Sequence, residues 1–137
     1  MPVTDTAAWP QAPKSAAVSV AAANTTLTDS PDDTALLLTA GANGSRIGHL
    51  KALPRATVSG AMVGYLYHSI DSGTTKRLIK AVAIAADTVS TTDAPAEVDF
   101  GYTEDAPLYL SAGAELYAGI SVALTDGVVF IASYQDY

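Results

Sequence analysis

The stretch ELYAGISVALTDGVVFIASY, residues 115–134, contains the pattern that recurs along most of this chain. Apolar and small or polar side chains alternate through its first ten residues, which is the period of a half-buried β-strand. One face of that strand then holds Leu116, Ala118, Ile120, Val122 and Leu124. After an Asp-Gly turn signal, a second alternating run extends to Tyr134. Two such runs joined by a short Asp-Gly connection predict a β-hairpin.

Similar alternating segments occupy most of the chain from residue 16 onward, separated by turn-forming residues. They cover residues 34–40, 45–53, 55–60, 61–70, 76–85, 96–101 and 107–113. The DSGTT turn at 71–75 joins two of them into a second predicted hairpin, and GANGS at 41–45 is another predicted turn. No segment has a helical stripe, although residues 76–87 are rich in alanine. About eight to ten short strands predict an all-β fold, an antiparallel β-sandwich of jelly-roll type.

The first 15 residues differ from the rest of the chain, because they contain three prolines and the single tryptophan, Trp9. Since proline restricts φ, this segment is predicted to be an extended N-terminal arm, preceding one β-sandwich domain over residues 16–137. We expect Val3, Trp9 and Pro10 to dock on a neighbouring subunit, since Trp is a frequent interface anchor. The alternative is that Trp9 folds back over its own sandwich as a plug.

Charge is unevenly distributed along the sequence. The net charge is −7, but residues 1–80 carry +2 and residues 81–137 carry −9. The acidic balance argues against direct binding of nucleic acid, and no apolar run approaches the ~20 residues of a membrane span. A polarised surface would instead meet an opposite patch on a copy or a partner, with Arg46, Lys51 and Arg55 as candidate contacts. The alternative is that the charge serves solubility alone.

Tyrosine is the main aromatic residue of the chain. Tyr67 and Tyr117 fall on the less apolar faces of their predicted strands, which makes them candidate interface residues. Packing within the sheet and stacking on carbohydrate are the alternatives for these side chains. The sequence has no signal-peptide pattern, so the protein is expected to be soluble and not exported.

The sequence shows no recognisable catalytic, cofactor-binding or metal-binding pattern. His49 and His68 both lie inside predicted strands, where a packing or interface role is expected, and the chain has no cysteine. None of the G-x-S-x-G, H-E-x-x-H and P-loop motifs occurs. The acidic stretches 28–33 and 91–105 lack the pattern of a calcium loop, so turns are predicted there, with calcium binding as the alternative. The chain is therefore not expected to be an enzyme.

The stretch from Asn24 to Tyr137 resembles capsid decoration, or cement, proteins of tailed bacteriophages. The resemblance is carried by NTTLTDSP at 24–31, LLLTAGANGSRI at 36–47, LKALPRATV at 50–58, DSGTTKRLI at 71–79 and DFGYTEDAPLYLSAGAELYAGISVAL at 99–124. It implies a homotrimeric β-fold, made in the bacterial host cytoplasm, that binds the major capsid protein on the virion surface and stabilises the head. It also implies an N-terminal arm that binds the shell or a neighbouring copy.

Two other classes of function are compatible with the sequence. One is a tail or head-fibre module that binds host-surface carbohydrate, which predicts exposed aromatic side chains clustered on loops at one end. The other is a small jelly-roll enzyme, which needs two or three histidines and a glutamate converging on a metal inside the barrel. His49 and His68 without H-x-H spacing disfavour the enzyme, and aromatic residues located mostly in strands disfavour the carbohydrate module.

Overall fold

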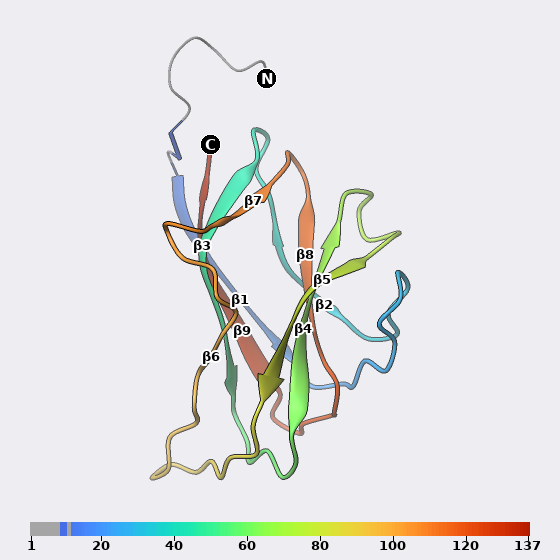
Figure 1. The fold of residues 1–137 in the computed structure, drawn as a ribbon, viewed down its shortest axis with the longest axis vertical. Helices are drawn as coiled ribbons and strands as arrows, with labels where there is room; N and C mark the ends of the chain where they lie inside the picture. The colour runs from blue at the N-terminus through green and yellow to red at the C-terminus, as the bar shows by residue number, and fades with distance from the viewer. Residues whose placement is uncertain (1–8, 11) are drawn as a thin grey trace.

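The computed structural model describes residues 9, 10 and 12–137, and every regular element in this part of the chain is a β-strand (Figure 1). The strands are β1 (Ala12–Val20), β2 (Ala35–Thr39), β3 (Ser45–Pro54), β4 (Met62–Ser69), β5 (Arg77–Ile84), β6 (Val98–Asp99), β7 (Leu108–Leu110), β8 (Glu115–Ile120) and β9 (Val128–Asp136). None of the described segments is a helix long and apolar enough to cross a membrane.

These strands form two antiparallel sheets, which are seen side by side in Figure 1. One sheet has the order β1-β9-β3-β6, with β7 also pairing with β3, and the other has the order β2-β8-β4-β5. The first strand pairs with the last, β2 with β8, β3 with β7, and β4 with β5. The chain is thus one long antiparallel ribbon wound into two sheets, which is the arrangement of a jelly roll. The predicted fold class is confirmed.

The core lies between the sheets and is built from the inward-facing residues of the alternating strands. Leu116, Ala118 and Ile120 of β8 are fully buried, as the predicted apolar face requires. Burial of such side chains is the main favourable contribution to folding. β8 ends at Ile120, so the predicted strand is too long, and the predicted apolar face is wrong at Val122, which is 52% exposed. Leu124 is partly buried and still packs against the core.

The hairpin predicted over residues 115–134 is wrong, because its two strands belong to different sheets. β8 pairs with β2 and β4, whereas β9 pairs with β1 and β3. The Asp-Gly turn does form, since the Gly127 amide donates to the Leu124 carbonyl at 2.9 Å and Gly127 has a φ of 75°. The turn lies within a connection that crosses from one sheet to the other. Local alternation therefore predicted that both strands exist but not which strands they pair with.

The second predicted hairpin is confirmed, because β4 and β5 are antiparallel neighbours. Their pairing runs from Met62 with Ile84 to His68 with Arg77, next to the turn. Its turn contains two positive φ angles, 58° at Ser72 and 84° at Gly73. A glycine tolerates that conformation without a steric penalty. The strand predicted over residues 55–60 is wrong, since that segment contributes only an isolated bridge between Val58 and Asp87.

The boundary predicted at residue 15 between arm and domain is also wrong. β1 begins at Ala12 and pairs with β9 along its whole length, so residues 12–15 belong to the sandwich. Pro13 is accommodated because β1 is an edge strand, where a missing N–H need not break a ladder. Of the expected arm contacts, Trp9 and Pro10 precede β1, whereas Val3 lies outside the described residues.

Candidate functional site

Basic side chains are gathered on the outer face of β3. Arg46 and Lys51 are five positions apart, so a regular strand would place them on opposite faces. A register shift between Ile47 and His49 inserts one extra residue, Gly48, in the pairing with β9. This bulge brings Arg46, His49 and Lys51 to one face, while Ile47 stays fully buried. Sequence alternation alone could not reveal this cluster, because the bulge changes the parity of the strand.

Each of these basic groups is already paired within the chain. The Arg46 guanidinium lies 3.0 Å from the Glu104 carboxylate, and the Lys51 ammonium lies 3.1 Å from that of Glu97. His49 Nε2 lies 3.5 Å from Asp99. The acids all belong to the segment that returns along β3 before β7. The basic first part of the sequence thus meets the acidic second part inside one molecule, rather than only across an interface.

Arg55, the third basic residue predicted at an interface, follows β3 directly. Its guanidinium donates to the Ser19 hydroxyl at 2.8 Å, which connects the end of β3 to the edge strand β1. Arg46, Lys51 and Arg55 are therefore brought to one side of the molecule, as candidates for a shared surface. The acidic partners of Arg46 and Lys51, Glu104 and Glu97, are exposed, and ion pairs with an exposed member contribute little to stability.

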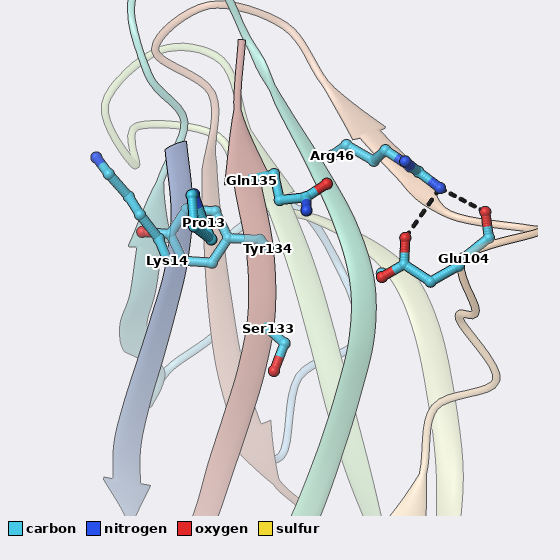
Figure 2. Close-up of a pocket in the computed structure, with 8 residues that line it drawn as sticks. Pro13, Lys14, Arg46, Glu104, Ser133, Tyr134 and Gln135 are labelled. Atoms are coloured by element: carbon cyan, nitrogen blue, oxygen red, sulfur yellow. Dashed lines mark hydrogen bonds and ion pairs between the residues drawn. The ribbon is translucent and has the colours of Figure 1, made fainter. Parts of the chain in front are cut away.

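A shallow pocket of about 260 Å³ lies at the end of this face (Figure 2). It is lined by Pro13, Lys14, Arg46, Gly48, Glu104, Ser133, Tyr134 and Gln135. The Glu104 carboxylate lies over Gly48, where a side chain would collide with it. Arg46 Nε is buried there without a hydrogen-bond partner in the described part of the chain. The pocket offers a hydroxyl, an amide and charged groups, which are suited to a polar ligand.

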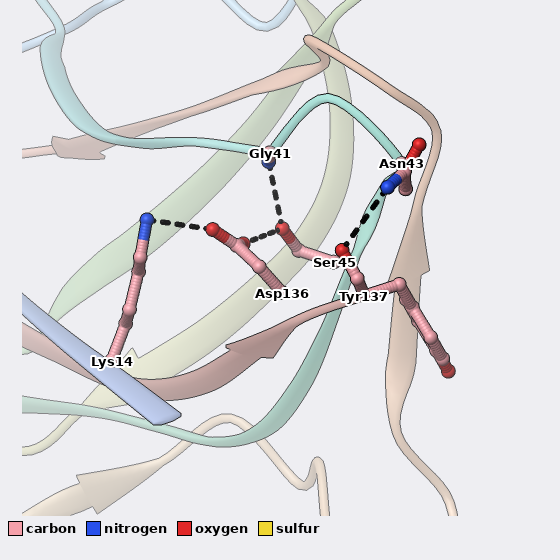
Figure 3. A network of polar contacts seen from close by, with 6 residues as sticks. All are labelled: Lys14, Gly41, Asn43, Ser45, Asp136 and Tyr137. Atoms are coloured by element: carbon pink, nitrogen blue, oxygen red, sulfur yellow. Dashed lines mark hydrogen bonds and ion pairs between the residues drawn. The ribbon is translucent and has the colours of Figure 1, made fainter. Parts of the chain in front are cut away.

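Next to the pocket, a polar network joins both ends of the domain (Figure 3). The Lys14 ammonium lies 2.6 Å from Asp136 Oδ2, and the buried Ser45 hydroxyl donates to Asp136 Oδ1. The Gly41 amide donates to the same hydroxyl at 3.1 Å. Hydrogen bonds from Lys14 and then from Ser45 hold the pKa of Asp136 below its usual value. The hydrogen bond to Asp136 correspondingly raises the pKa of Lys14. We call this cluster the terminal network.

Tyr67 does not lie on an accessible surface, so its predicted interface role is wrong. It is fully buried beneath the segment between β1 and β2. Its hydroxyl accepts from Asn24 Nδ2 at 2.6 Å and donates to the Thr26 carbonyl at 2.8 Å. Burial raises the pKa of this phenol. The less apolar face of β4 is thus covered by a loop, which the period of the strand cannot predict.

Tyr117 is half-buried on the same outer face, in β8. The Lys76 ammonium lies 4.2 Å from the centre of its ring, and its hydroxyl donates to Glu115 at 3.2 Å. Burial, followed by the Glu115 charge, raises the pKa of Tyr117. Tyr117 therefore remains a candidate contact residue, but it lies on the opposite sheet from Arg46, Lys51 and Arg55.

In the structure, an acidic side chain of the stretch 28–33 accepts hydrogen bonds that stabilise the local backbone. Asp32 accepts from the Thr25 amide at 2.9 Å and from the Thr25 hydroxyl at 3.0 Å, which lowers the pKa of Asp32. Among the residues that the structure describes, no group of three or more His, Cys, Asp or Glu side chains is placed to hold a metal ion. His49 faces Asp99, and His68 is half-buried in β4.

Trp9, which precedes the edge strand β1, is 70% exposed. Its side chain does not fold back over its own sandwich, so the alternative that Trp9 acts as a plug is wrong. Tyr109 is the second strongly exposed aromatic residue, at 65%, and it pairs with Arg46 across β3 and β7. Sequence reasoning did not single out Tyr109 from the other tyrosines, although the alternation in PLYLSAG places its side chain on the opposite strand face from Leu108 and Leu110.

No family model and no curated protein matches this sequence. Among solved structures, the chain is similar to the Eiger TNF from S. frugiperda, with 8% sequence identity and a TM-score of 0.47. The similarity covers 93% of this chain and 96% of that one. At this level of similarity it carries no argument about function.

Proposed function

We propose that this chain is a virion structural protein without catalytic activity, which decorates and stabilises the head of a tailed bacteriophage. Its partners are the major capsid protein and further copies of itself, arranged as a trimer. The observation that carries this proposal is the strong exposure of Trp9, which precedes the edge strand β1. Tryptophan is enriched among the residues that contribute most to binding at protein–protein interfaces, which supports Trp9 as an anchor.

The architecture supports the proposal in a second way. Jelly rolls occur as domains of viral capsid proteins and of lectins. A decoration protein acts in many copies, so modest contacts at each copy add up through multivalency. Little more is required of each copy than a stiff domain and one anchoring segment.

The first test is to label intact particles of the virus that encodes this chain with an antibody against it, and to image them by electron microscopy. Label distributed over the head supports the proposal. Label confined to the tail or its fibres favours the carbohydrate-binding alternative, and the absence of label on particles overturns both.

A second test addresses the anchor. Particles lacking this protein are mixed with wild-type chain, with Trp9→Ala, or with Tyr109→Ala as a matched exposed aromatic. We expect Trp9→Ala to lower the number of bound copies, since it removes the apolar anchor, and Tyr109→Ala to bind like the wild type. Equal binding of Trp9→Ala and the wild type would contradict the role of the arm.

A carbohydrate-binding tail or head-fibre module is a second candidate, favoured by one specific arrangement. Tyr109 is exposed and lies opposite Arg46 in the pairing of β7 with β3, and Arg46 lines the pocket together with Ser133 and Gln135. An aromatic ring beside amide, hydroxyl and charged groups is suited to a sugar. Saturation-transfer NMR with bacterial surface glycans tests this candidate, and Tyr109→Ala should abolish any signal while Trp9→Ala should leave it unchanged.

A further inference from the structure

The free edge of β1 is unusual among the edges of this sandwich. β1 pairs with β9 on one side, and no backbone group in the described part of the chain bonds to its other side. It is nine residues long and pairs without a register shift. Such a strand presents a row of unpaired N–H and C=O groups, which is a template for another strand.

The remaining edges carry features that discourage pairing. β2 has five residues and a register shift, and β6 and β7 have only two and three residues. β5 is longer, but its pairing is shifted and it carries Arg77 and Lys80. Short strands, bulges and exposed charges are the usual protection of a sheet edge. β1 carries two protecting residues only at its start, Pro13 and the half-exposed Lys14, which is bound to Asp136. Residues 15–20 contain neither a proline nor a charge.

We propose that β1 pairs with β1 of a second copy of this chain, edge to edge and antiparallel, to give one continuous sheet through two molecules. The contact goes beyond the proposed function, because it concerns how two copies meet whatever they decorate. It is isologous, so in an assembly of trimers it would join copies of different trimers.

The side chains of β1 fit this occupant. A twofold axis perpendicular to the shared sheet keeps the inner faces of both copies on the same side of that sheet. The two β1 strands must then pair so that one residue lies opposite the same residue of the other copy. With Ala16 or Ala17 at the axis, two methyl groups meet, and Lys14 faces Val18 or Val20 of the other strand. No pair of like charges is then opposed, which antiparallel neighbours require.

Charge also favours this edge as the place where two copies meet. Each copy has a net charge of −7, so most surfaces of two copies repel. Residues 6–28 contain no Asp or Glu. The nearby Asp136 carboxylate is neutralised by Lys14. Two molecules can therefore approach along β1 without confronting carboxylates.

The test uses charge at Ala17, which is exposed on the outer face of β1 opposite Ile131. Sedimentation velocity of the purified full chain is measured over a concentration series up to about 1 mM. We expect the wild type to associate in pairs, and Ala17→Lys and Ala17→Glu each to pair at least about tenfold more weakly. Like charges then meet at the axis when Ala17 is central, or lie diagonally across it when Ala16 is central. An equimolar mixture of the two variants should restore pairing, with native mass spectrometry showing the mixed species.

Ala83→Lys is the matched control, since Ala83 is also an exposed alanine on an edge strand. It should pair like the wild type, because β5 is not part of the proposed contact. Circular dichroism establishes that all variants are folded. A wild type that stays unpaired, charged variants that pair normally, or a mixture that fails to restore pairing would each overturn the inference. Because the experiment needs no particles, its failure is distinct from failure of the decoration role.

Discussion

The Lys14 ammonium lies 2.6 Å from Asp136 Oδ2, and this contact ties the start of the first strand to the end of the last. On the other side of the same carboxylate, the fully buried Ser45 hydroxyl donates from the start of β3. One carboxylate thus holds three strands of one sheet together at the end where the chain enters and leaves the domain. A charged acceptor shared between two donors makes stronger hydrogen bonds than a neutral one.

The terminal network predicts a defined pH dependence of stability. The pKa of Asp136 is lowered from 3.8, so its contribution is present above that value and is lost as pH falls through the lowered pKa. The pKa of Lys14 is raised from 10.5, so its contribution is present below that value and is lost as pH rises through the raised pKa. The full contribution therefore lies between these two ordinary values.

Asp136→Asn tests this, because it removes the charge and keeps the shape. We expect it to destabilise the domain between pH 4 and pH 10, and the difference from the wild type to shrink in stronger acid. Urea unfolding at a series of pH values measures the difference. Asp105→Asn is the control, since Asp105 is exposed and makes no hydrogen bond among the described residues. A difference that persists unchanged at pH 2 would contradict the ion pair as its source.

Tyr67→Phe should loosen the segment between β1 and β2. It removes the hydroxyl that bonds Asn24 and the Thr26 carbonyl, and buried polar partners left unsatisfied cost about 1–3 kcal/mol of unfolding free energy. The amides of Thr26 and Asp32, which donate to Asn24 Oδ1, should exchange hydrogen faster. Tyr65→Phe is the matched control, because the Tyr65 hydroxyl makes no hydrogen bond within the described residues. Equal effects of both variants would contradict this role of Tyr67.

Gly48→Ala should act through Glu104 and not through the backbone. The added methyl group would occupy the position of the Glu104 carboxylate, whereas Gly48 has no left-handed φ. We expect Gly48→Ala and Glu104→Ala each to cost less than about 1 kcal/mol, as exposed ion pairs do, and the double variant to cost no more than either. Thermal unfolding of the four proteins gives the coupling. Strictly additive losses would show that Gly48 does not support the pair.

The limit of the buried face of β8 can be tested by one substitution on each side of it. Ile120→Asp should abolish folding, because Ile120 is fully buried and an unpaired charge in the core is expensive. Val122→Asp, two residues later, should change stability by no more than about 0.5 kcal/mol, because Val122 is half exposed. Solubility and circular dichroism of the two variants distinguish them. A folded Ile120→Asp, or an unfolded Val122→Asp, would contradict the end of β8 at Ile120.

The two predicted hairpins show what alternation can and cannot reveal. Residues 61–85 and 115–134 have the same local signature, with two alternating runs around a glycine turn. The first pair forms a hairpin, while the strands of the second pair join opposite sheets. The residues of such a glycine turn are compatible both with a hairpin and with a connection that crosses between the sheets. The choice depends on which strands from elsewhere in the chain cover the apolar faces.

The candidate site was less predictable than the fold. The sequence identified Arg46, Lys51 and Arg55 as basic residues but placed no two of them together. The bulge at Gly48 aligned Arg46 with Lys51, and the segment that returns along β3 supplied their acidic partners. Tyr67 was misjudged because a loop covers the face of its strand.

The sequence by itself determined the period of two, the position of most strands, the buried face of β8 and the turn at 71–75. These features depend on residues within a few positions of one another, so local sterics and alternating polarity are sufficient. Only the tertiary structure decided which sheet each strand joins, which side chains the loop between β1 and β2 covers, and which charges neutralise each other. These depend on contacts between distant segments, such as Lys14 and Asp136, that form only when the whole ribbon is wound.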